Sequence, residues 1–350
     1  MKKTILLTGG AGFIGSHVAR AVLANPDLRH YRLIVLDDLS GGFRENVPQN
    51  PRVEFVLGSI TDEKLIDTLF DHHRFAYVYH LAAYAAEGLS HFIRRFNYSN
   101  NLLGSVNLIN AAVNYDTDCF VFTSSIAVYG AGQVPMQEDM VPQPEDPYGI
   151  SKHAVELDLK AAHDFFGLNY VIFRPHNVYG EYQNIGDRYR NVVGIFMNQI
   201  LQGKPMTIFG DGSQQRAFTY IGDIAPIIAS SPLVNKGKNR IFNIGADQPY
   251  SVHYLAHEVA KAMEVPPQIA HLPLRSEVAV AYSDHSAVRA IFGKTKQTPL
   301  QEGLHRMAGW VKAVGTRKSK DFENIEINRN LPPSWIGPAA EKRLRAAGTA

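Results

Sequence analysis

The chain has 350 residues, of which 45% are hydrophobic and 19% are charged, the balance of an ordinary globular protein with a large core. Its 35 basic and 33 acidic residues leave a formal net charge of +2, which predicts no general attraction to nucleic acid or to a membrane surface. The single cysteine, Cys119, excludes an internal disulfide framework and is typical of a reducing compartment. The apolar run before the first glycines is too short for a signal peptide, and the sequence has no stretch of about 18 apolar residues, so we expect a cytoplasmic protein.

The first predicted strand, residues 4–8, runs into the glycine-rich sequence GGAGFIG at residues 9–15. A helix is predicted next, because apolar residues recur at helical spacing over residues 14–23. The glycines permit a tight turn, and the helix N-terminus then faces a pyrophosphate. A second strand, residues 32–36, ends at Asp37, whose carboxylate would hold a ribose 2′-hydroxyl and repel a 2′-phosphate. This pattern predicts a dinucleotide site that prefers NAD to NADP.

Short apolar strands then alternate with helical patterns throughout residues 1–180. Further strands are predicted at residues 53–57, 76–78, 120–123 and 170–173. This alternation predicts a doubly wound parallel sheet, in which ligands bind at the carboxyl ends of the strands. The residues expected at that edge are Gly9, Asp37, Leu81, Ser125 and Pro175.

The sequence YGISK places Tyr148 and Lys152 four residues apart, on one face of a predicted helix. A free phenol has a pKa of about 10 and is a poor base at neutral pH. A cation ~4 Å away, at an effective dielectric constant of ~20, contributes about 4 kcal/mol, which corresponds to roughly three pKa units. With help from an oxidised nicotinamide ring, the Lys152 ammonium would therefore make Tyr148 a base near pH 7, while Ser125 hydrogen-bonds the same substrate oxygen.

Nine ordered segments carry a family resemblance: TGGAGFIG, DDLSGG, HLAA, NNLLGS, SSIAVYG, YGISK, RPHNVYG, FGDGSQQRAFTYIGD and FNIGA. Over about residues 3–312 the chain resembles the extended short-chain dehydrogenase/reductase family, in its nucleotide-sugar epimerase branch. The resemblance implies a Rossmann-type doubly wound parallel sheet with a smaller α/β substrate-binding C-terminal domain. It also implies tightly held NAD, the catalytic set Ser125, Tyr148 and Lys152, and a relay or structural role for Asn100.

The residues expected to contact the cofactor are Gly9, Gly12, Phe13, Ile14, Asp37, Asp38, Ile60, Asp62, Leu81, Ala82, Ala83, Asn100, Thr123, Tyr148, Lys152 and Pro175. One departure from the family is Ser59, where many relatives carry an aspartate near the adenine. On the substrate side the resemblance implies contacts from Ser125 and Asn177. It also implies that Arg216 and Arg275 clamp the diphosphate, a role that bidentate guanidinium geometry suits.

Several features of the substrate side stay open. His176 stands where the family usually carries an aromatic residue. Arg188 and Arg190 would grip a phosphate or a sugar carboxylate, or simply lie in solvent. The position that gates bulky sugar substituents is Ala281 or Tyr282, depending on the alignment. The sequence therefore does not identify the sugar, nor establish that the nucleotide is UDP.

We expect the NAD-binding domain at residues 1–176, with interleaved later segments at roughly 214–245, and the substrate domain at residues 177–313. Residues 314–350 are polar, lack sustained apolar periodicity and read as an appendage of unknown purpose.

A homodimer is implied by the resemblance, through the helices predicted near residues 92–113 and 149–166. Those helices carry apolar residues beyond the needs of one core face: Ile109, Val113, Val155 and Leu159. No metal site is expected, because His253 and His257, four residues apart, lack the glutamate of a metal-binding helix.

The resemblance favours epimerisation at C4 of a nucleotide-linked sugar, such as a UDP-hexose. Tyr148 would take the proton of the 4-hydroxyl, and the C4 hydride would pass to NAD and return to the opposite face of the rotated 4-keto sugar. A 4,6-dehydratase would carry an acidic pair after Ser125, where Ile126 and Ala127 stand. A GDP-mannose-type 3,5-epimerase would carry a cysteine in place of Ala127. A non-catalytic NAD-sensing or RNA-binding relative would commonly lack Tyr148 or Lys152.

Overall fold

A computed structural model describes residues 3–132, 134–187, 189–274, 278–293, 297–318, 322, 324–332 and 335. Its largest sheet has seven parallel strands in the order β11-β6-β5-β4-β1-β2-β3. These strands are β1 (Thr4–Thr8), β2 (Arg32–Asp37), β3 (Val53–Leu57), β4 (Tyr77–His80), β5 (Cys119–Thr123), β6 (Tyr170–Pro175) and β11 (Arg240–Ile244). The chain runs outward from β1 to β3 and then crosses back to β4, so the doubly wound parallel sheet predicted from the sequence is confirmed.

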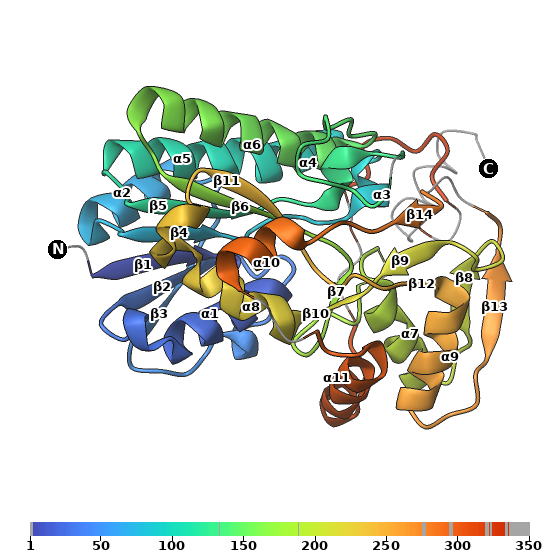
Figure 1. The fold of residues 1–350 in the computed structure, drawn as a ribbon. Helices are drawn as coiled ribbons and strands as arrows, with labels where there is room; N and C mark the ends of the chain where they lie inside the picture. Colours follow the sequence, from blue (N-terminus) through green and yellow to red (C-terminus); the bar gives the residue numbers. More distant parts are fainter. Residues whose placement is uncertain are drawn as a thin grey trace.

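Helices cover both faces of this sheet (Figure 1). One face is covered by α1 (Phe13–Ala24) and α8 (Ile221–Ser230), and the other by α2 (Glu63–His73), α5 (Gly104–Asn114) and α6 (Pro147–Phe166). The strands are apolar on both sides, as buried parallel strands require. In β1, Ile5 and Leu7 join the core under α1, whereas Leu6 joins the core under α5 and α6.

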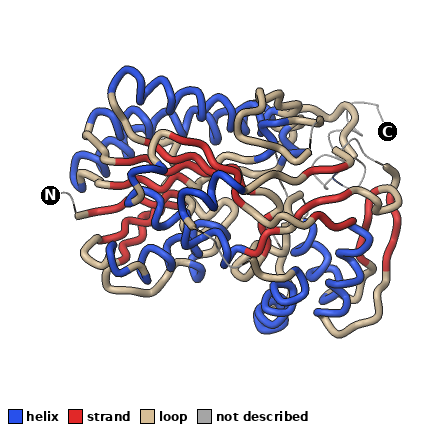
Figure 2. The backbone as a smooth tube through the Cα atoms, viewed as in Figure 1, coloured by secondary structure: helices blue, strands red, loops and turns tan. Residues whose placement is uncertain are grey.

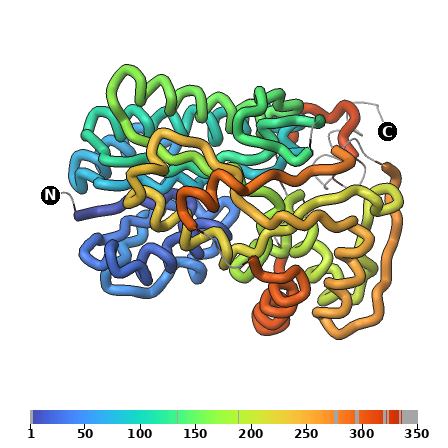
Figure 3. The backbone as a smooth tube through the Cα atoms, viewed as in Figure 1, coloured from blue at the N-terminus to red at the C-terminus, as the bar shows by residue number. Residues whose placement is uncertain are grey.

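A smaller α/β part lies beyond the carboxyl ends of these strands (Figures 1 and 2). Its strands are β8 (Met206–Phe209), β9 (Gln215–Ala217), β12 (Pro249–Ser251), β13 (Ile269–Leu272) and β14 (Val280–Ala281), and its helices are α7 (Val192–Leu201), α9 (Val252–Ala262) and α11 (Leu300–Val314). The strand pair β7 (Val178–Tyr179) and β10 (Thr219–Tyr220) lies where the two parts meet. The colours of Figure 3 show the chain crossing between the parts more than once, because β11 and α10 (Ser286–Phe292) return to the main sheet.

Short helical segments complete the described fold. They are α3 (Glu87–Ser90), α4 (Arg94–Tyr98), the single π-turn η3 (Ser99–Leu103), and the 3₁₀ turns η1 (Pro26–Leu28), η2 (Arg44–Asn46), η4 (Ile126–Tyr129), η5 (Ser231–Leu233) and η6 (Asn235–Gly237). Within the described residues, no helix has the length and apolar character needed to span a membrane.

The apolar residues assigned from sequence to a dimer face lie in the core of the chain or pack against it. Ile109, Val155 and Leu159 are buried in the core between the sheet and its helices, and Val113 packs against that core. The interface role predicted for Ile109, Val155 and Leu159 is therefore wrong, since the chain's own core buries them, whereas for the partly buried Val113 it stays a prediction.

Candidate active site

A cavity of about 1420 Å³ lies at the carboxyl ends of the main strands, facing the smaller part of the protein. Eighteen of the residues predicted from sequence to form a site line it: Gly9, Gly12, Phe13, Ile14, Asp37, Asp38, Ile60, Leu81, Ala82, Ala83, Asn100, Thr123, Ser125, Tyr148, Lys152, Pro175, Asn177 and Arg216. Asp62 is described but is not among the lining residues. Its carboxylate instead caps α2 by accepting a hydrogen bond from the backbone N–H of Leu65 at 3.1 Å.

The glycine-rich turn between β1 and α1 is shaped for close approach of a ligand. Gly9 has a φ of +75°, and a Cβ there would lie 2.6 Å from the backbone nitrogen of Ala82. A Cβ at Gly15 would lie 2.1 Å from the carbonyl oxygen of Gly9. Gly12, the N-cap residue of α1, has no side chain with which to cap the helix. The N-terminal amides of α1 therefore face the cavity side of the turn as a site for an anion such as a pyrophosphate.

Asp37 ends β2 and lines the same cavity. Its Oδ2 accepts a hydrogen bond from the backbone N–H of Ala11 at 2.9 Å, and its Oδ1 accepts one from Leu39 at 2.8 Å. Burial raises the pKa of this carboxyl, and the two backbone hydrogen bonds oppose that rise. A carboxylate has about four acceptor positions, so Asp37 retains capacity for the two hydroxyls of a ribose.

Local sequence fixes the start of α6, which carries two of the predicted catalytic residues. Asp146 is the N-cap and accepts a hydrogen bond from the N–H of Gly149 at 3.0 Å, and Pro147 occupies the first turn. This cap places Tyr148 and Lys152 at the cavity, with Ser125 approaching from the end of β5. The three predicted catalytic side chains therefore meet at one point of the cavity.

Burial is the largest influence on the pKa values of this cluster. The Lys152 Nζ donates to the carbonyl oxygen of Thr123 at 2.8 Å and lies 5.8 Å from the centroid of the Tyr148 ring. Burial lowers the pKa of Lys152 to about 7, and Glu156 opposes that shift. Burial also raises the pKa of Tyr148, despite a hydrogen bond with Ser125. The chain's own residues therefore do not lower the pKa of Tyr148 without the positive charge of an oxidised nicotinamide ring, which the sequence-based expectation included.

A buried ion pair fixes the helix face that carries Lys152. One turn further along α6, Glu156 accepts hydrogen bonds from Arg174 of β6, at 2.9 Å from Nε and 2.6 Å from Nη2. Both side chains are only 2% exposed. Arg174 holds the pKa of Glu156 below its usual range, although burial acts in the opposite direction. The pair therefore locks α6 against β6 next to the catalytic cluster.

On the substrate side, Arg216 donates hydrogen bonds to the backbone carbonyls of Gln215, Val278 and Ala279 and lines the cavity. Asn177 also lines it and lies just before β7, with a φ of +40°. Of the two gate positions, Ala281 lines the cavity, whereas Tyr282 is not among the lining residues. Arg275 lies outside the described residues.

The loop before α7 also contributes to the cavity. Arg190 lines it and donates a hydrogen bond from Nε to the Asp187 carboxylate at 2.7 Å. Its guanidinium carbon lies 4.9 Å from the centroid of the Tyr84 ring. Arg190 therefore faces the cavity and not open solvent, while Arg188 lies outside the described residues.

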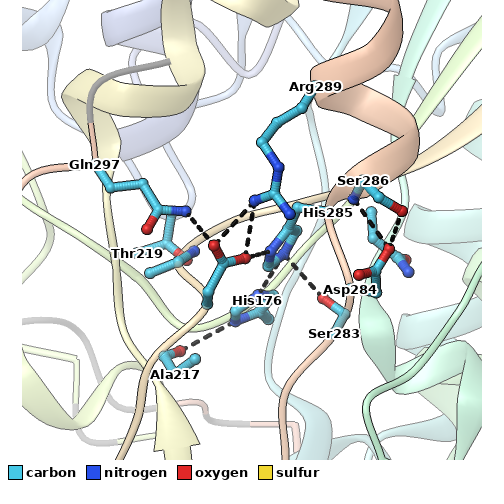
Figure 4. A network of polar contacts seen from close by, with 12 residues as sticks. His176, Ala217, Thr219, Ser283, Asp284, His285, Ser286, Arg289 and Gln297 are labelled. Carbon is cyan, nitrogen blue, oxygen red and sulfur yellow. Dashed lines mark hydrogen bonds and ion pairs between the residues drawn. The ribbon is translucent and has the colours of Figure 1, made fainter. Parts of the chain in front are cut away.

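His176 belongs to a network that joins β6 to the segment before α10 (Figure 4). Its Nδ1 hydrogen-bonds the carbonyl of Ala217 at 3.0 Å, and its Nε2 lies 3.0 Å from Nε2 of His285. His285 in turn contacts the carboxylate of Asp247 at 2.7 Å, which also accepts hydrogen bonds from Arg289. His176 thus links the end of β6 to β9 of the smaller part.

This network predicts a specific acid sensitivity. Burial, followed by repulsion from His285, lowers the pKa of His176 to about 3. Between pH 6.5 and 3 the unfolded chain binds a proton at this position that the folded chain does not, so the free energy of unfolding falls as the pH falls. At pH 5 the loss from His176 is about 2 kcal/mol. Urea denaturation at pH 7 and pH 5 measures the free energy of unfolding at each pH. Between pH 7 and pH 5, this free energy should fall less for His176→Phe than for the wild type.

A matched control for this comparison is His253→Phe, because His253 is an exposed histidine of α9. It should keep the pH dependence of the wild type. Equal pH dependence for His176→Phe and the wild type would contradict the role assigned to His176.

Sequence reasoning missed many of the lining residues, and two groups stand out among them. One group surrounds α3: Tyr84, Glu87, Gly88, His91 and Phe92. The other belongs to the C-terminal region: Asn330, Leu331, Pro332 and Trp335. Trp335, a large aromatic residue in a mostly polar region, is a sequence feature that could have pointed to the second group. Among the described residues, no group of three or more histidine, cysteine, aspartate or glutamate side chains is arranged to hold a metal ion.

The chain is similar in sequence to enzymes that act on nucleotide-linked sugars. The UDP-glucose 4-epimerase of Halalkalibacterium halodurans is 32% identical over 311 residues, which span 85% of this chain and 89% of that protein. The dTDP-D-glucose 4,6-dehydratase of Homo sapiens is 31% identical, with 75% of this chain and 74% of that protein covered.

Solved structures of UDP-glucose 4-epimerases are similar to the chain in fold. The UDP-glucose 4-epimerase of Thermotoga maritima, crystallised with UDP-glucose, aligns with a TM-score of 0.82 at 32% identity, covering 89% of this chain and 99% of that one. The UDP-glucose 4-epimerase of Thermus thermophilus, in complex with NAD, aligns with a TM-score of 0.81 at 31% identity, covering 88% and 99%. The model of the NAD dependent epimerase/dehydratase family matches residues 5–245, and the chain belongs to that family.

Proposed function

We propose that the protein is an NAD-dependent 4-epimerase of a nucleotide-linked sugar, with a UDP-hexose as the substrate class. The observation that carries this proposal is the meeting of Ser125, Tyr148 and Lys152 in one cavity with the glycine-rich turn and Asp37. The epimerases that resemble the chain, two of them with UDP-glucose or NAD bound, support the same activity.

NAD fits the residues present, because the uncapped N-terminus of α1 and the Asp37 carboxylate suit its pyrophosphate and ribose. When bound, it supplies the acceptor and donor for the hydrogen on C4 of the sugar. Once its phenol is deprotonated, which positive charge in the cavity would favour, Tyr148 would take the proton of the sugar 4-hydroxyl, and the Ser125 hydroxyl would hydrogen-bond the same sugar oxygen. In its protonated form Lys152 would contribute positive charge to the buried cluster, and Arg216 of β9 would hold the diphosphate during the reaction.

A 4,6-dehydratase is the second candidate, because a dehydratase relative exists and an acidic side chain lies near the phenol. Glu87 of α3 lines the cavity, and its charge contributes to raising the pKa of Tyr148. The residues directly after Ser125, however, are the apolar Ile126 and Ala127, and both line the cavity. Epimerisation therefore fits the side chains next to Ser125 better than dehydration.

Incubating the purified protein separately with UDP-glucose, UDP-N-acetylglucosamine and UDP-glucuronate tests the proposed function. We expect conversion of at least one of them to its C4 epimer. NMR of the anomeric protons measures this conversion. Recovery of all three unchanged, or release of water from any of them, would contradict the proposal.

The cofactor preference gives a separate prediction. Wild-type protein should bind NAD at least a hundredfold more tightly than NADP, because the Asp37 carboxylate would meet a charged 2′-phosphate in NADP. Asp37→Asn keeps the size of the side chain and removes its charge, so the preference should shrink about tenfold or more. Calorimetric titration of both nucleotides measures this. Equal affinities for NAD and NADP in the wild type would exclude the assignment of Asp37 to the ribose.

We also propose a homodimer, built on exposed apolar side chains of α6 and of the turn before α5. Ile150 and Leu157 are 40% and 56% exposed on α6, and Leu103 is 58% exposed before α5. Such apolar exposure on neighbouring helices is typical of a contact surface. Light scattering at micromolar concentration should give twice the chain mass for the wild type and the chain mass itself for Leu157→Glu.

A further inference from the structure

A segment near the C-terminus is bound to the wall of the cavity by backbone and side-chain hydrogen bonds. We call its described residues, Phe322, 324–332 and Trp335, the C-terminal strap. The backbone N–H of Glu326 donates to the carbonyl of Phe92 at 2.8 Å, and that of Ile327 donates to the same oxygen at 3.2 Å. The Glu326 carboxylate accepts hydrogen bonds from the N–H groups of Arg95 and Phe96 at 2.8 and 2.9 Å.

These bonds complete a helix end that its own sequence leaves open. The N-cap residue of α4 is Ile93, whose side chain makes no cap hydrogen bond. Glu326, more than 200 residues further along the chain, accepts these helix-capping hydrogen bonds instead. The strap is therefore docked specifically on the α3–α4 region.

An aromatic cluster reinforces the docking. Phe322 packs edge-on against Phe96, with ring centroids 4.9 Å apart. Trp335 packs edge-on against Tyr189 at 5.5 Å and Phe92 at 6.2 Å, and it is only 6% exposed. Burying an indole to this extent holds the strap on the protein through a large apolar contact.

The strap also faces the cavity, close to the catalytic tyrosine. Asn330, Leu331, Pro332 and Trp335 line it. The indole lies so near Gly88 of α3 that a Cβ there would be 3.1 Å from its Cη2. The same short helix carries Ser90, whose Oγ accepts a hydrogen bond from the N–H of Tyr148 at 3.2 Å. Trp335 and Tyr148 therefore both contact the same short helix.

We propose that the C-terminal strap is a substrate-recognition element, in which Trp335 forms a wall of the sugar compartment and selects among sugars. This inference rests on the proposed function. Tyr148 must reach C4 of the sugar, so the cavity surface beside Tyr148 faces the sugar, whereas Arg216 faces the diphosphate. The C–H face of a hexopyranose packs against an aromatic ring, and an apolar wall discriminates substituents by size. The strap thereby gains a function that its polar sequence does not reveal.

Tryptophan fluorescence tests the contact directly, because the chain has two tryptophans. Trp310 packs against Tyr182, with centroids 5.9 Å apart, and is not among the cavity-lining residues. Trp310→Phe therefore leaves Trp335 as the reporter, and Trp335→Phe is the matched control that reports on Trp310. In Trp310→Phe, UDP-glucose should change the emission at least twice as much as UDP does, and Trp335→Phe should show no difference between the two ligands. An equal response of Trp310→Phe to UDP and UDP-glucose would overturn the proposal.

Kinetics give the second readout. Trp335→Ala should raise the KM for the best sugar substrate about tenfold, change its preference among UDP-sugars, and retain bound NAD. Trp310→Phe should keep the KM and the preference of the wild type. Unchanged KM and preference in NAD-loaded Trp335→Ala would overturn the role of the strap. Turnover by the wild type decides the proposed function separately, since no turnover of any UDP-sugar would reject that function whatever the variants do.

Discussion

Tyr148→Phe should lower turnover about a thousandfold while leaving NAD bound. The substitution removes the only atom of this side chain able to take the 4-hydroxyl proton, and general acid–base groups of this kind contribute factors of roughly 10² to 10⁴. It keeps the ring that is buried at the N-terminus of α6, so the cavity should retain its shape. Initial rates with the best UDP-sugar, together with NAD released from the denatured variant, measure both parts of the prediction.

The control is Tyr170→Phe, which removes the hydroxyl group from a buried tyrosine of β6 that is not among the cavity-lining residues. It should retain most of the turnover. If Tyr148→Phe kept more than about a tenth of the wild-type rate, Tyr148 would not be the catalytic base.

Breaking the Glu156–Arg174 ion pair should cost about 3–5 kcal/mol in the free energy of unfolding. Glu156→Gln and Arg174→Met each leave the partner charge buried without its counter-ion, since both side chains are 2% exposed. Replacing both residues, as in Glu156→Leu with Arg174→Met, removes both charges and should cost less than either single change. Urea denaturation at pH 7 measures all three.

The same pair predicts a dependence on pH. Arg174 lowers the pKa of Glu156, so the stability that the pair contributes is present above the unfolded pKa of about 4.3 and is lost as the pH falls below it. The salt bridge between Arg32 and Glu54 is a useful control, because its side chains are 63% and 46% exposed. Glu54→Gln should change the stability by less than about 1 kcal/mol. A similarly small effect for Glu156→Gln would show that the buried pair does not hold α6 in place.

Sequence alone predicts the parts of this protein that short-range rules determine. The strand and glycine turn ending at Gly15, the strand ending at Asp37, and the helix carrying Tyr148 and Lys152 follow from periodicity and spacing within about 30 residues. Their meeting at one cavity follows from the rule that ligands bind at the carboxyl ends of parallel strands.

Other features depend on contacts that no local pattern contains. A row of apolar residues on a helix does not identify what packs against it. From the sequence, Val155 and Leu159 are therefore equally consistent with an interface and with the core, in which the structure places them. The pKa of Tyr148 depends on burial, which spacing from Lys152 does not reveal. The C-terminal strap has no periodicity because Glu326 and Trp335 dock on residues more than 140 positions away, by hydrogen bonds and aromatic contacts and not as a regular element.

The most direct test of 4-epimerisation follows the hydrogens of the sugar in deuterium oxide. If Tyr148, Ser125 and Lys152 supply the acid–base groups, the C4 hydrogen leaves and returns within the cavity, and no carbon-bound hydrogen exchanges with solvent. NMR and mass spectrometry of UDP-sugars equilibrated by the wild type should therefore show interconversion without deuterium at C3, C4 or C5. Deuterium at C5, or loss of water, would contradict the account and assign the proton transfer to a further group such as Glu87.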